Sequence, residues 1–421
     1  MKNLKPFIIL LTLISTHINL IAQNAKVIDL SKRLYVGEQF TPPSSIKLMR
    51  GMENKINWKA LYDKVVLIDL FETSCGSCIQ IMPHLQELEK KHGNIFKVII
   101  VTPEDKKTMT DFFHKNEYLK EHKVNLPVIY QDDYFRKMFP YKSIPQAILL
   151  YQGKVQAITS SGFITSDNIL KLHQQGSIDL PLKDDFGKGN LLAASGSVTE
   201  ILKAGVFFSG YQSDVNYQPW KFETDSVTGL YRSSIFNSGI YSALKSLMAN
   251  AKLLDKYFVP RMDRVVWKVK DSTIYENFSA NPKEVWLVDN GISYERYDRI
   301  KRPDSIQALE IMYDFESIYG VKIYLDKKLM PCLVLKSCVA VPSKEKKEGQ
   351  MVYVGSKVFA TFLDYVNQFP PVIDEVNIDT RIEVGNVKTL EELNKQLVVY
   401  GIRGEIEERK IDVLVVEEVN L

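Results

Sequence analysis

The sequence predicts two domains of different classes, an α/β domain over residues 23–176 and an α+β domain over residues 199–421. In the first region, apolar strand patterns alternate with helical patterns and a strand hairpin closes the series, which is typical of one α/β layer domain. Residues 177–198 are rich in Gly, Ser, Asp and Lys and are therefore expected to form a linker. Beyond it, strand-rich segments are separated by only a few helices.

Composition excludes several classes of protein. A chain of 421 residues has length for two or three domains, and 45% apolar with 25% charged residues fits globular domains rather than disordered, fibrous or polytopic membrane proteins. The formal net charge is only +3 and no long basic run occurs, so we expect no nucleic-acid partner. All six histidines lie at or before His173, which excludes a His-based zinc site or a Ser-His-Asp triad in the second half.

The N-terminus has the parts of a secretory signal, which we place at residues 1–22. Lys2 and Lys5 precede the apolar run Phe7–Ile14, and small or polar residues begin at Ala22. Polar residues interrupt the run before it reaches the about 20 residues that a spanning helix needs, so we expect no permanent membrane span. No cysteine lies near the cleavage site, which argues against a lipoprotein. The expected location is the periplasm or cell envelope, and an uncleaved N-terminal anchor would leave the protein in the same compartment.

The order of elements in the first domain follows from hydrophobic periodicity and from turn residues. A continuous apolar run such as Val65–Phe71 is typical of a buried strand, and Gln152-Gly153 is typical of a hairpin turn. The expected strands are 65–71, 96–101, 126–130, 146–151 and 154–159, and the expected helices are 78–91, 106–118, 134–139 and 167–174.

Cys75-Gly76-Ser77-Cys78 lies where the first buried strand gives way to a helix. Two cysteines at this spacing can close a small disulfide, and the free N–H groups and dipole of a helix N-terminus favour the thiolate of the first. Nucleophilic attack needs that thiolate, and a resolving cysteine must lie within its reach. A zinc site would need a second pair of ligands, and the other two cysteines are about 250 residues away. We therefore predict a redox motif and no metal, with a zinc site and an inert structural disulfide as the alternatives.

The segment Val66–Cys78, with Pro83 five residues later, resembles the active-site strand and helix of thioredoxin-like proteins. The segment Ser143–Ala147 resembles the cis-proline loop of the same family. The additional length between Cys78 and Pro145 makes the chain similar to the exported TlpA-type, ResA-like thiol–disulfide oxidoreductases. The resemblance covers roughly residues 25–175.

This resemblance implies a fold, an activity and the roles of five residues. It implies a thioredoxin-like domain that exchanges disulfides with protein thiols and disulfides and uses no cofactor. Cys75 would be the attacking thiolate, Cys78 the resolving thiol, and Cys75–Cys78 the redox disulfide. Asp69 would relay the proton, with a structural buried acid as its alternative role. Ile144 and Pro145 would position the disulfide of the partner.

Two departures from the family pattern leave the direction of the reaction open. Ser74 stands where the family usually carries a tryptophan before the first cysteine. The dipeptide Gly76-Ser77 lacks both the proline common in reductants and the histidine of strong oxidants. A reductase is the expectation from the family. The alternatives are an envelope binding or scaffold protein with a non-catalytic or weakly active cysteine pair, and a peroxidase.

The second domain carries a weak internal repeat. Asp304–Lys336 aligns without gaps with Gly385–Glu417 at an offset of 81. Each copy is expected to form a helix, a Gly terminator, a strand, a charged turn and a second strand, as a duplicated αββ unit would; a chance likeness of two helix-Gly-strand segments is the alternative. The order of elements resembles an uncharacterised domain of exported bacterial proteins, and we expect it to act as a docking module.

The remaining cysteines, Cys332 and Cys338, lie in one apolar, strand-like run. Six residues of strand separate them by about 20 Å, whereas a disulfide needs Cα atoms within about 7 Å. We expect two separate buried thiols. A disulfide formed across a local turn and a thiol relay with Cys75 and Cys78 are the alternatives.

Overall fold

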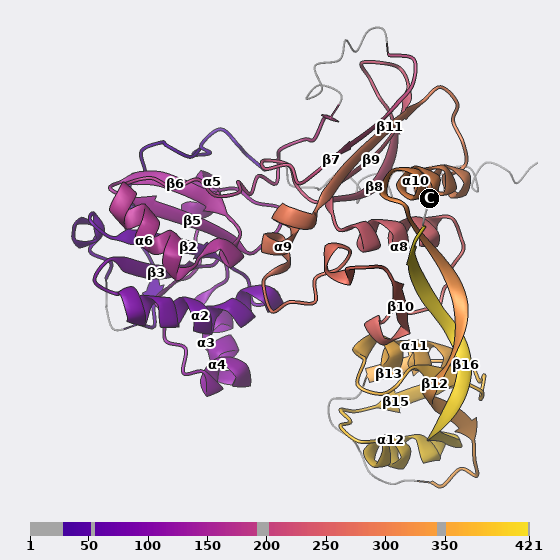
Figure 1. Cartoon of the computed structure of the whole chain (residues 1–421). Coiled ribbons are helices and arrows are strands. Elements are labelled where there is room, and N and C mark those ends of the chain that lie inside the picture. Colours follow the sequence, from indigo (N-terminus) through magenta and orange to yellow (C-terminus); the bar gives the residue numbers. More distant parts are fainter. Residues whose placement is uncertain (1–27, 52–54, 192–201, 343–350, 420–421) are drawn as a thin grey trace, which may run out of the picture. The chain divides into compact units, whose positions relative to one another are not determined.

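The computed structural model describes residues 28–51, 55–191, 202–342 and 351–419. The predicted signal, residues 1–22, lies outside these ranges. Among the described residues, no helix is both long enough and apolar enough to cross a membrane. The chain divides into two units, which are described separately: the first ends at Lys188 and also includes Ser213–Asn216, and the second comprises Gly189–Gln212 and Tyr217–Leu421 (Figure 1).

The first unit is built around a six-stranded sheet with the order β1-β4-β3-β2-β5-β6. The three strands β2, β3 and β4 run parallel, while β5 and β6 form an antiparallel hairpin beside β2. The strands are β1 (Leu48–Met49), β2 (Val65–Leu70), β3 (Phe96–Val101), β4 (Val128–Ile129), β5 (Gln146–Tyr151) and β6 (Lys154–Thr159). The helices are α2 (Gly76–His92), α3 (Lys106–Lys115), α4 (Glu117–Glu121), α5 (Phe135–Met138) and α6 (Ser166–Gln175).

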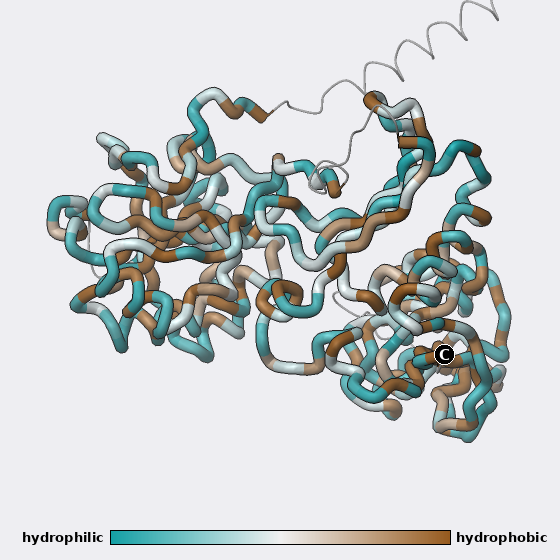
Figure 2. Tube along the Cα trace, turned by 45° about the horizontal axis from the view of Figure 1, so that its top comes forward, coloured by the Kyte–Doolittle hydropathy of each residue, from teal (hydrophilic) through white to brown (hydrophobic). Residues whose placement is uncertain are grey.

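The central strand β2 is buried on both faces, as its continuous apolar run predicts. Leu67 belongs to a core on the side of α2 and α6, which also contains Cys78. Ile68 belongs to a second core on the opposite side, with aromatic residues from α5 and from the segment that follows it. Hydrophobic residues accordingly gather in the interior of the first unit, and hydrophilic residues lie mainly at its periphery (Figure 2).

The single helix expected over 106–118 is two helices, which is a correction to the sequence prediction. Asn116 ends α3 and also begins α4, where its side chain accepts a hydrogen bond from the backbone N–H of Leu119. A residue with a short polar side chain favours this capping position over the helix interior, so it divides a segment whose hydrophobic period continues. The expected strand 126–130 shortens to β4.

The predicted linker is folded onto the first unit in its first part. Lys183 N donates to the carbonyl of Ile158 at the edge of β6, and Thr159 Oγ1 donates to the carbonyl of Pro181. On the other side of this segment, Leu182 N donates to Ser213 Oγ. Residues up to Lys188 therefore belong to the first unit rather than to a free tether.

The second unit repeats one order of elements, βαββαβ. The first repeat consists of β9 (Tyr231–Ser238), α8 (Ile240–Asn250), β10 (Val265–Lys268), β11 (Ile292–Asp298), α10 (Asp304–Tyr319) and β12 (Val321–Ser337), with α9 (Lys283–Asn290) inserted before β11. The second consists of β13 (Met351–Val354), α11 (Ser356–Val366), β14 (Val372–Asp374), β15 (Arg381–Val384), α12 (Leu390–Leu397) and β16 (Ile402–Glu418). Two further strands, β7 (Gly205–Ser209) and β8 (Gln218–Thr224), flank β11 and β9 in a sheet of order β7-β11-β9-β8.

The two repeats exchange their last strands. Strand β10 of the first repeat pairs in parallel with β16 of the second, and β14 of the second pairs in parallel with β12 of the first. Strands β12 and β16 pair antiparallel along their whole length and form the long twisted ribbon in orange and yellow in Figure 1. Leu329 pairs with Lys410, and these two residues are also equivalent at the offset of 81 that aligns the repeats. Because equivalent residues pair at this point, an approximate two-fold axis passes through the middle of the ribbon and relates the two strands.

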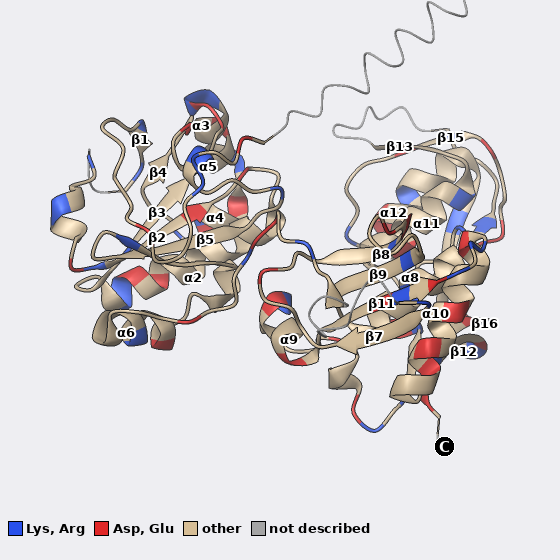
Figure 3. Ribbon diagram, turned by 90° about the horizontal axis from the view of Figure 1, so that it is seen from above, with Lys and Arg blue, Asp and Glu red and all other residues tan. Residues whose placement is uncertain are grey.

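The prediction of a charged turn within each copy is wrong, because β12 and β16 are continuous strands of 17 residues each. The ends of each strand are buried in separate cores, while the middle is mostly exposed. Lys327 and Asp412 form an ion pair across the ribbon at 2.7 Å. A charged stretch therefore marks the solvated middle of a paired ribbon here, a role that the sequence pattern alone does not distinguish from a turn. Both signs of charge are interspersed over each unit (Figure 3).

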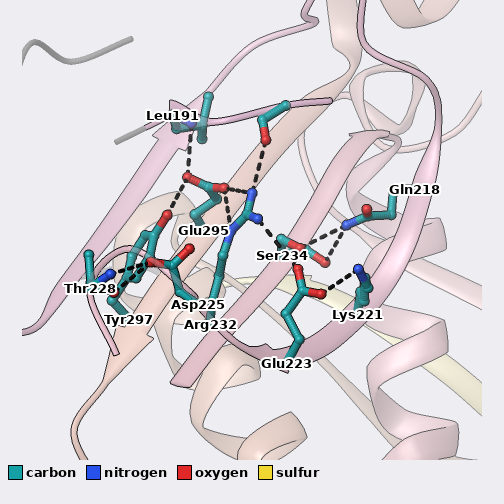
Figure 4. Close-up of polar contacts among 11 residues, drawn as sticks. Leu191, Gln218, Lys221, Glu223, Asp225, Thr228, Arg232, Ser234, Glu295 and Tyr297 are labelled. Carbon is teal, nitrogen blue, oxygen red and sulfur yellow. Dashed lines mark hydrogen bonds and ion pairs between the residues drawn. The ribbon is translucent and has the colours of Figure 1, made fainter. Parts of the chain in front are cut away.

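A buried ion pair fixes the start of the second unit to its first sheet (Figure 4). Arg232 on β9 donates from Nε to the carboxylate of Glu295 on β11 at 2.7 Å, and the Glu295 side chain is fully buried. The other Glu295 oxygen accepts from Leu191 N at 2.9 Å, and Arg232 donates to the carbonyl of Gly189 at 2.9 Å. Because both charges are paired and hydrogen-bonded, the chain entering the unit is held on the sheet.

Candidate functional site

The two cysteines of the motif lie at the N-terminus of α2, directly after β2 and a short turn. Their sulfur atoms form a disulfide, with the Cα atoms 5.3 Å apart. Cys75 is half-buried, whereas Cys78 is fully buried. Cys75 is also the N-cap residue of α2, and its Sγ accepts from the backbone N–H of Cys78 at 3.2 Å. Once the pair is reduced, solvent or a partner reaches the Cys75 sulfur first, and the helix N-terminus stabilises its thiolate.

A carboxylate on a neighbouring loop holds the turn before Cys75. Thr73 donates to Glu104 from both its backbone N–H, at 3.0 Å, and its hydroxyl, at 2.6 Å. Thr73 follows β2 and Glu104 follows β3, and these parallel strands end at the same edge of the sheet. Glu104 is not among the site residues predicted from the sequence, although its placement after a strand parallel to β2 is a signal that could have identified it.

Asp69 lies within β2 and is completely buried. It alternates with Leu67 and Phe71, so its side chain is on the face of β2 whose core contains Cys78. Its Oδ1 accepts from the hydroxyl of Ser161 at 2.7 Å, and its Oδ2 has no hydrogen-bond partner among the described residues. Burial raises the pKa of Asp69 to about 7, an effect that the hydrogen bond from Ser161 only partly offsets. Asp69 can therefore gain or lose a proton near neutral pH.

Ile144 and Pro145 form the loop before β5, and the peptide bond between them is cis. Both residues are half-buried. The side chains of Ile144 and Cys75 pack against the same core, the one that contains Cys78. The structure thus brings the loop, both cysteines and the face of β2 that carries Asp69 together around one core.

A second carboxylate beside the motif was also missed from the sequence. Glu72, three residues before Cys75, accepts a hydrogen bond of 3.1 Å from the hydroxyl of Tyr141. Burial and the negative charge of Glu72 raise the pKa of Tyr141 well above its usual value. Glu72 therefore links the cysteine turn to the segment that leads into the Ile144–Pro145 loop.

The histidines near the motif are engaged elsewhere. His84 Nε2 lies 3.2 Å from the carbonyl of Ile164, and His92 Nε2 lies 2.6 Å from Ser166 Oγ. Within the described ranges, no three His, Cys, Asp or Glu side chains are grouped so that they could hold a metal ion.

Cys332 and Cys338 are unpaired thiols. Cys332 is fully buried in the C-terminal half of β12, and this burial raises the pKa of its thiol. Cys338 follows the end of the same strand and is only half-buried, which corrects the expectation that both thiols are buried. Both belong to the second unit, whereas Cys75 and Cys78 belong to the first.

No family model and no curated protein matches the chain. Many solved structures are similar to part of it, and the following three are among them. The thioredoxin domain of a thiol–disulfide oxidoreductase from Bacteroides vulgatus is 18% identical, with a TM-score of 0.24, over 34% of this chain and 99% of that chain. A thiol–disulfide isomerase from Corynebacterium glutamicum is 16% identical, with a TM-score of 0.25, over 32% of this chain and 94% of that one. The N-terminal domain of PilB from Neisseria gonorrhoeae is 17% identical, with a TM-score of 0.24, over 29% of this chain and 83% of that one.

Proposed function

We propose that this protein is an exported, thioredoxin-like thiol–disulfide oxidoreductase of the TlpA type, and that it reduces disulfides in partner proteins. The observation that carries the proposal is the asymmetry of the cysteine pair. A half-buried Cys75 caps α2 and is joined to a fully buried Cys78. One sulfur is placed to attack a partner, and the other is placed to attack the first sulfur.

The reaction moves two electrons from the cysteine pair to the partner. The Cys75 thiolate attacks one sulfur of the partner disulfide, so a mixed disulfide forms and the other partner sulfur leaves as a thiolate that takes a proton from solvent. Cys78 then loses its proton, attacks Cys75 Sγ and releases the second partner thiol. The pair ends as the Cys75–Cys78 disulfide, and an external thiol reductant must reduce it before the next cycle.

Asp69 has the properties needed to accept the proton of Cys78. Cys78 is fully buried, so its thiol has no direct route to bulk solvent. Asp69 lies on the same core face, has an oxygen without a partner among the described residues, and has a pKa of about 7. A base whose pKa is near the working pH is the most effective one for such a transfer. We assign Asp69 this relay role, through a water molecule where direct contact is absent.

Ile144 and Pro145 are proposed to position the partner. Their loop and Cys75 share one core, so an extended polypeptide that offers its disulfide to Cys75 would run along this loop. We propose further that the second unit selects protein partners, and that export delivers the chain to the periplasm or cell envelope. The alternative is a binding or scaffold protein with an inert cysteine pair, and partner trapping distinguishes it from an oxidoreductase.

Partner trapping tests the proposal. In the Cys78→Ser chain, Cys75 can still attack, but nothing resolves the mixed disulfide. We expect this variant to accumulate covalent adducts with reduced-and-reoxidised insulin or with envelope proteins, visible on non-reducing gels and removed by dithiothreitol. Both chains also carry Cys338→Ala, because Cys338 is a half-buried free thiol. The matched Cys75→Ser chain then keeps only buried thiols and should give none. Equal adducts from both variants, or none from either, would favour the scaffold alternative.

A further inference from the structure

A buried ion pair lies in the segment after α6, outside the residues that carry the chemistry. Lys183 Nζ and Asp185 Oδ1 are 2.9 Å apart, and the Asp185 side chain has no exposed surface. Burial alone would raise the pKa of Asp185, but Lys183 and the hydrogen bonds to the carboxylate outweigh that effect and lower it. Asp185 is therefore a buried carboxylate that stays charged near neutral pH, and such groups are retained where they are fully hydrogen-bonded.

Apart from Lys183, the partners of Asp185 belong to the loop that precedes the cis peptide. Its Oδ2 accepts from the backbone N–H groups of Lys142 and Ser143, each at 2.7 Å. The hydroxyl of Ser143 also donates to the carboxylate, at 3.1 Å. Lys183 Nζ donates in turn to the carbonyl of Ser143 at 2.8 Å. Two consecutive residues of an exposed loop thus have their polar groups held by one ion pair.

The next residue along the loop, Ile144, is not held in this way. Within the part of the chain that the structure describes, no hydrogen bond uses its backbone N–H or C=O. Ile144 packs on the core shared with Cys75. Free backbone groups can pair with an extended polypeptide, as the edge of a sheet does with an added strand. The ion pair therefore fixes Lys142 and Ser143, the two residues directly before the free N–H and C=O groups of Ile144.

We propose that Asp185, together with Lys183, is a positioning residue for the exchange reaction, holding Lys142 and Ser143 so that the backbone of Ile144 is presented to polypeptide substrates. This inference rests on the proposed function. A disulfide within a polypeptide gains from this pairing, whereas a small disulfide without a peptide backbone does not, so the two kinds of substrate report separately on the loop. Asp185 touches neither cysteine and acts only through the loop.

The test compares two substrates in the full chain carrying Asp185→Asn. Insulin has a polypeptide backbone, whereas 5,5′-dithiobis(2-nitrobenzoate) has none. We expect the KM for insulin to rise about tenfold, because a tenfold change corresponds to the loss of a few polar contacts. The kcat for insulin should stay within twofold, and the rate with the small disulfide should fall less than twofold. The Asp179→Asn chain is the matched control, since Asp179 is an exposed carboxylate in the same segment.

Two kinetic results would overturn the inference: an insulin KM within twofold of wild type, or a parallel fall with both substrates. A wild-type chain that reduces neither substrate would instead overturn the proposed function. Amide hydrogen exchange on the wild-type chain needs no variant to fold. We expect the amides of Lys142 and Ser143 to exchange at least about tenfold more slowly than that of Ile144, because only the first two are hydrogen-bonded. Equal exchange at all three would also refute the inference.

Discussion

Replacing Cys75 with alanine is expected to lower the rate of insulin disulfide reduction by about a thousandfold or more, to the level of the uncatalysed reaction with dithiothreitol. Cys75 is the half-buried sulfur at the helix N-terminus, while Cys78 is fully buried. The remaining Cys78 thiol cannot reach a protein disulfide without disrupting the core around it. The measurement is the turbidity of precipitating insulin chains, followed with the full-length protein.

The matched control for this prediction is Cys338→Ala. Cys338 is the half-buried free thiol, so its removal tests whether any accessible sulfur would serve. We expect the Cys338→Ala chain to match wild type. If Cys75→Ala retained wild-type activity, or if Cys338→Ala lost as much as Cys75→Ala, the assignment of Cys75 as the nucleophile would be refuted.

Replacing Asp69 with asparagine is expected to remove most of the pH dependence of stability in the first unit. The pKa of Asp69 is about 7 in the folded chain, above the value of 3.8 that an exposed aspartate has. The folded state therefore binds the proton more tightly than the unfolded state, and the resulting stability is present in full below about pH 4 and lost as the pH rises through 7. Between pH 5 and pH 8.5, the wild-type unit should lose about 3 kcal/mol of unfolding free energy from this group.

Asparagine has no charge to bury, so the Asp69→Asn chain should lack this loss and be the more stable protein at pH 8.5. The oxidised protein is unfolded in urea at both pH values. The urea midpoint is read from the hydrogen exchange of peptides from β2 and α2, measured by mass spectrometry. Asp63→Asn, at an exposed carboxylate near the start of β2, should behave like wild type. If wild type and Asp69→Asn lost the same free energy between the two pH values, the raised pKa of Asp69 would be wrong.

The proton-relay role predicts a second, kinetic property of the Asp69→Asn chain. If Asp69 accepts the proton of Cys78, the rate at which the mixed disulfide resolves should rise through pH 7 in wild type, and this rise should be absent in Asp69→Asn. A structural buried acid would give the stability result without the kinetic one. The two measurements together therefore separate the two roles considered for this residue.

Much of the first unit could be predicted because its signals are local. The strands β3, β5 and β6 match the sequence expectation to the residue, and the turn between β5 and β6 has positive φ at Gln152 and Gly153. Continuous apolar runs bounded by polar turn residues determine such strands without reference to distant parts of the chain. The position of the cysteine motif at the N-terminus of a helix followed from the same local signals.

Contacts between distant segments could not be predicted in the same way. Asp185 lies about 40 residues from the loop that it holds, within a stretch whose composition indicated only a linker. Glu104 reaches the cysteine turn because two parallel strands end at one edge of the sheet. Each carboxylate looks like an ordinary surface residue in the sequence, and only the fold shows that its partners are backbone groups near the site.

The second unit shows a further limit of local patterns. The offset of 81 aligned the two segments, but the charged residues between their apolar ends suggested a turn. In the structure these charges lie in the solvated middle of β12 and β16, which pair with each other. Whether a charged stretch turns or continues depends on the strand beside it, and that strand is the other copy of the same repeat.

The most direct test of the central claim is a redox titration of Cys75 and Cys78 in the full-length protein. The chain is equilibrated in thiol–disulfide buffers of stepped potential, the free thiols are alkylated, and the modified peptides are identified by mass spectrometry. We predict that both cysteines convert together in one two-electron transition between about −270 and −120 mV, the range of redox-active pairs in such folds, and nearer its reducing end. A pair that stays oxidised below about −300 mV would be a structural disulfide and would contradict the proposed function.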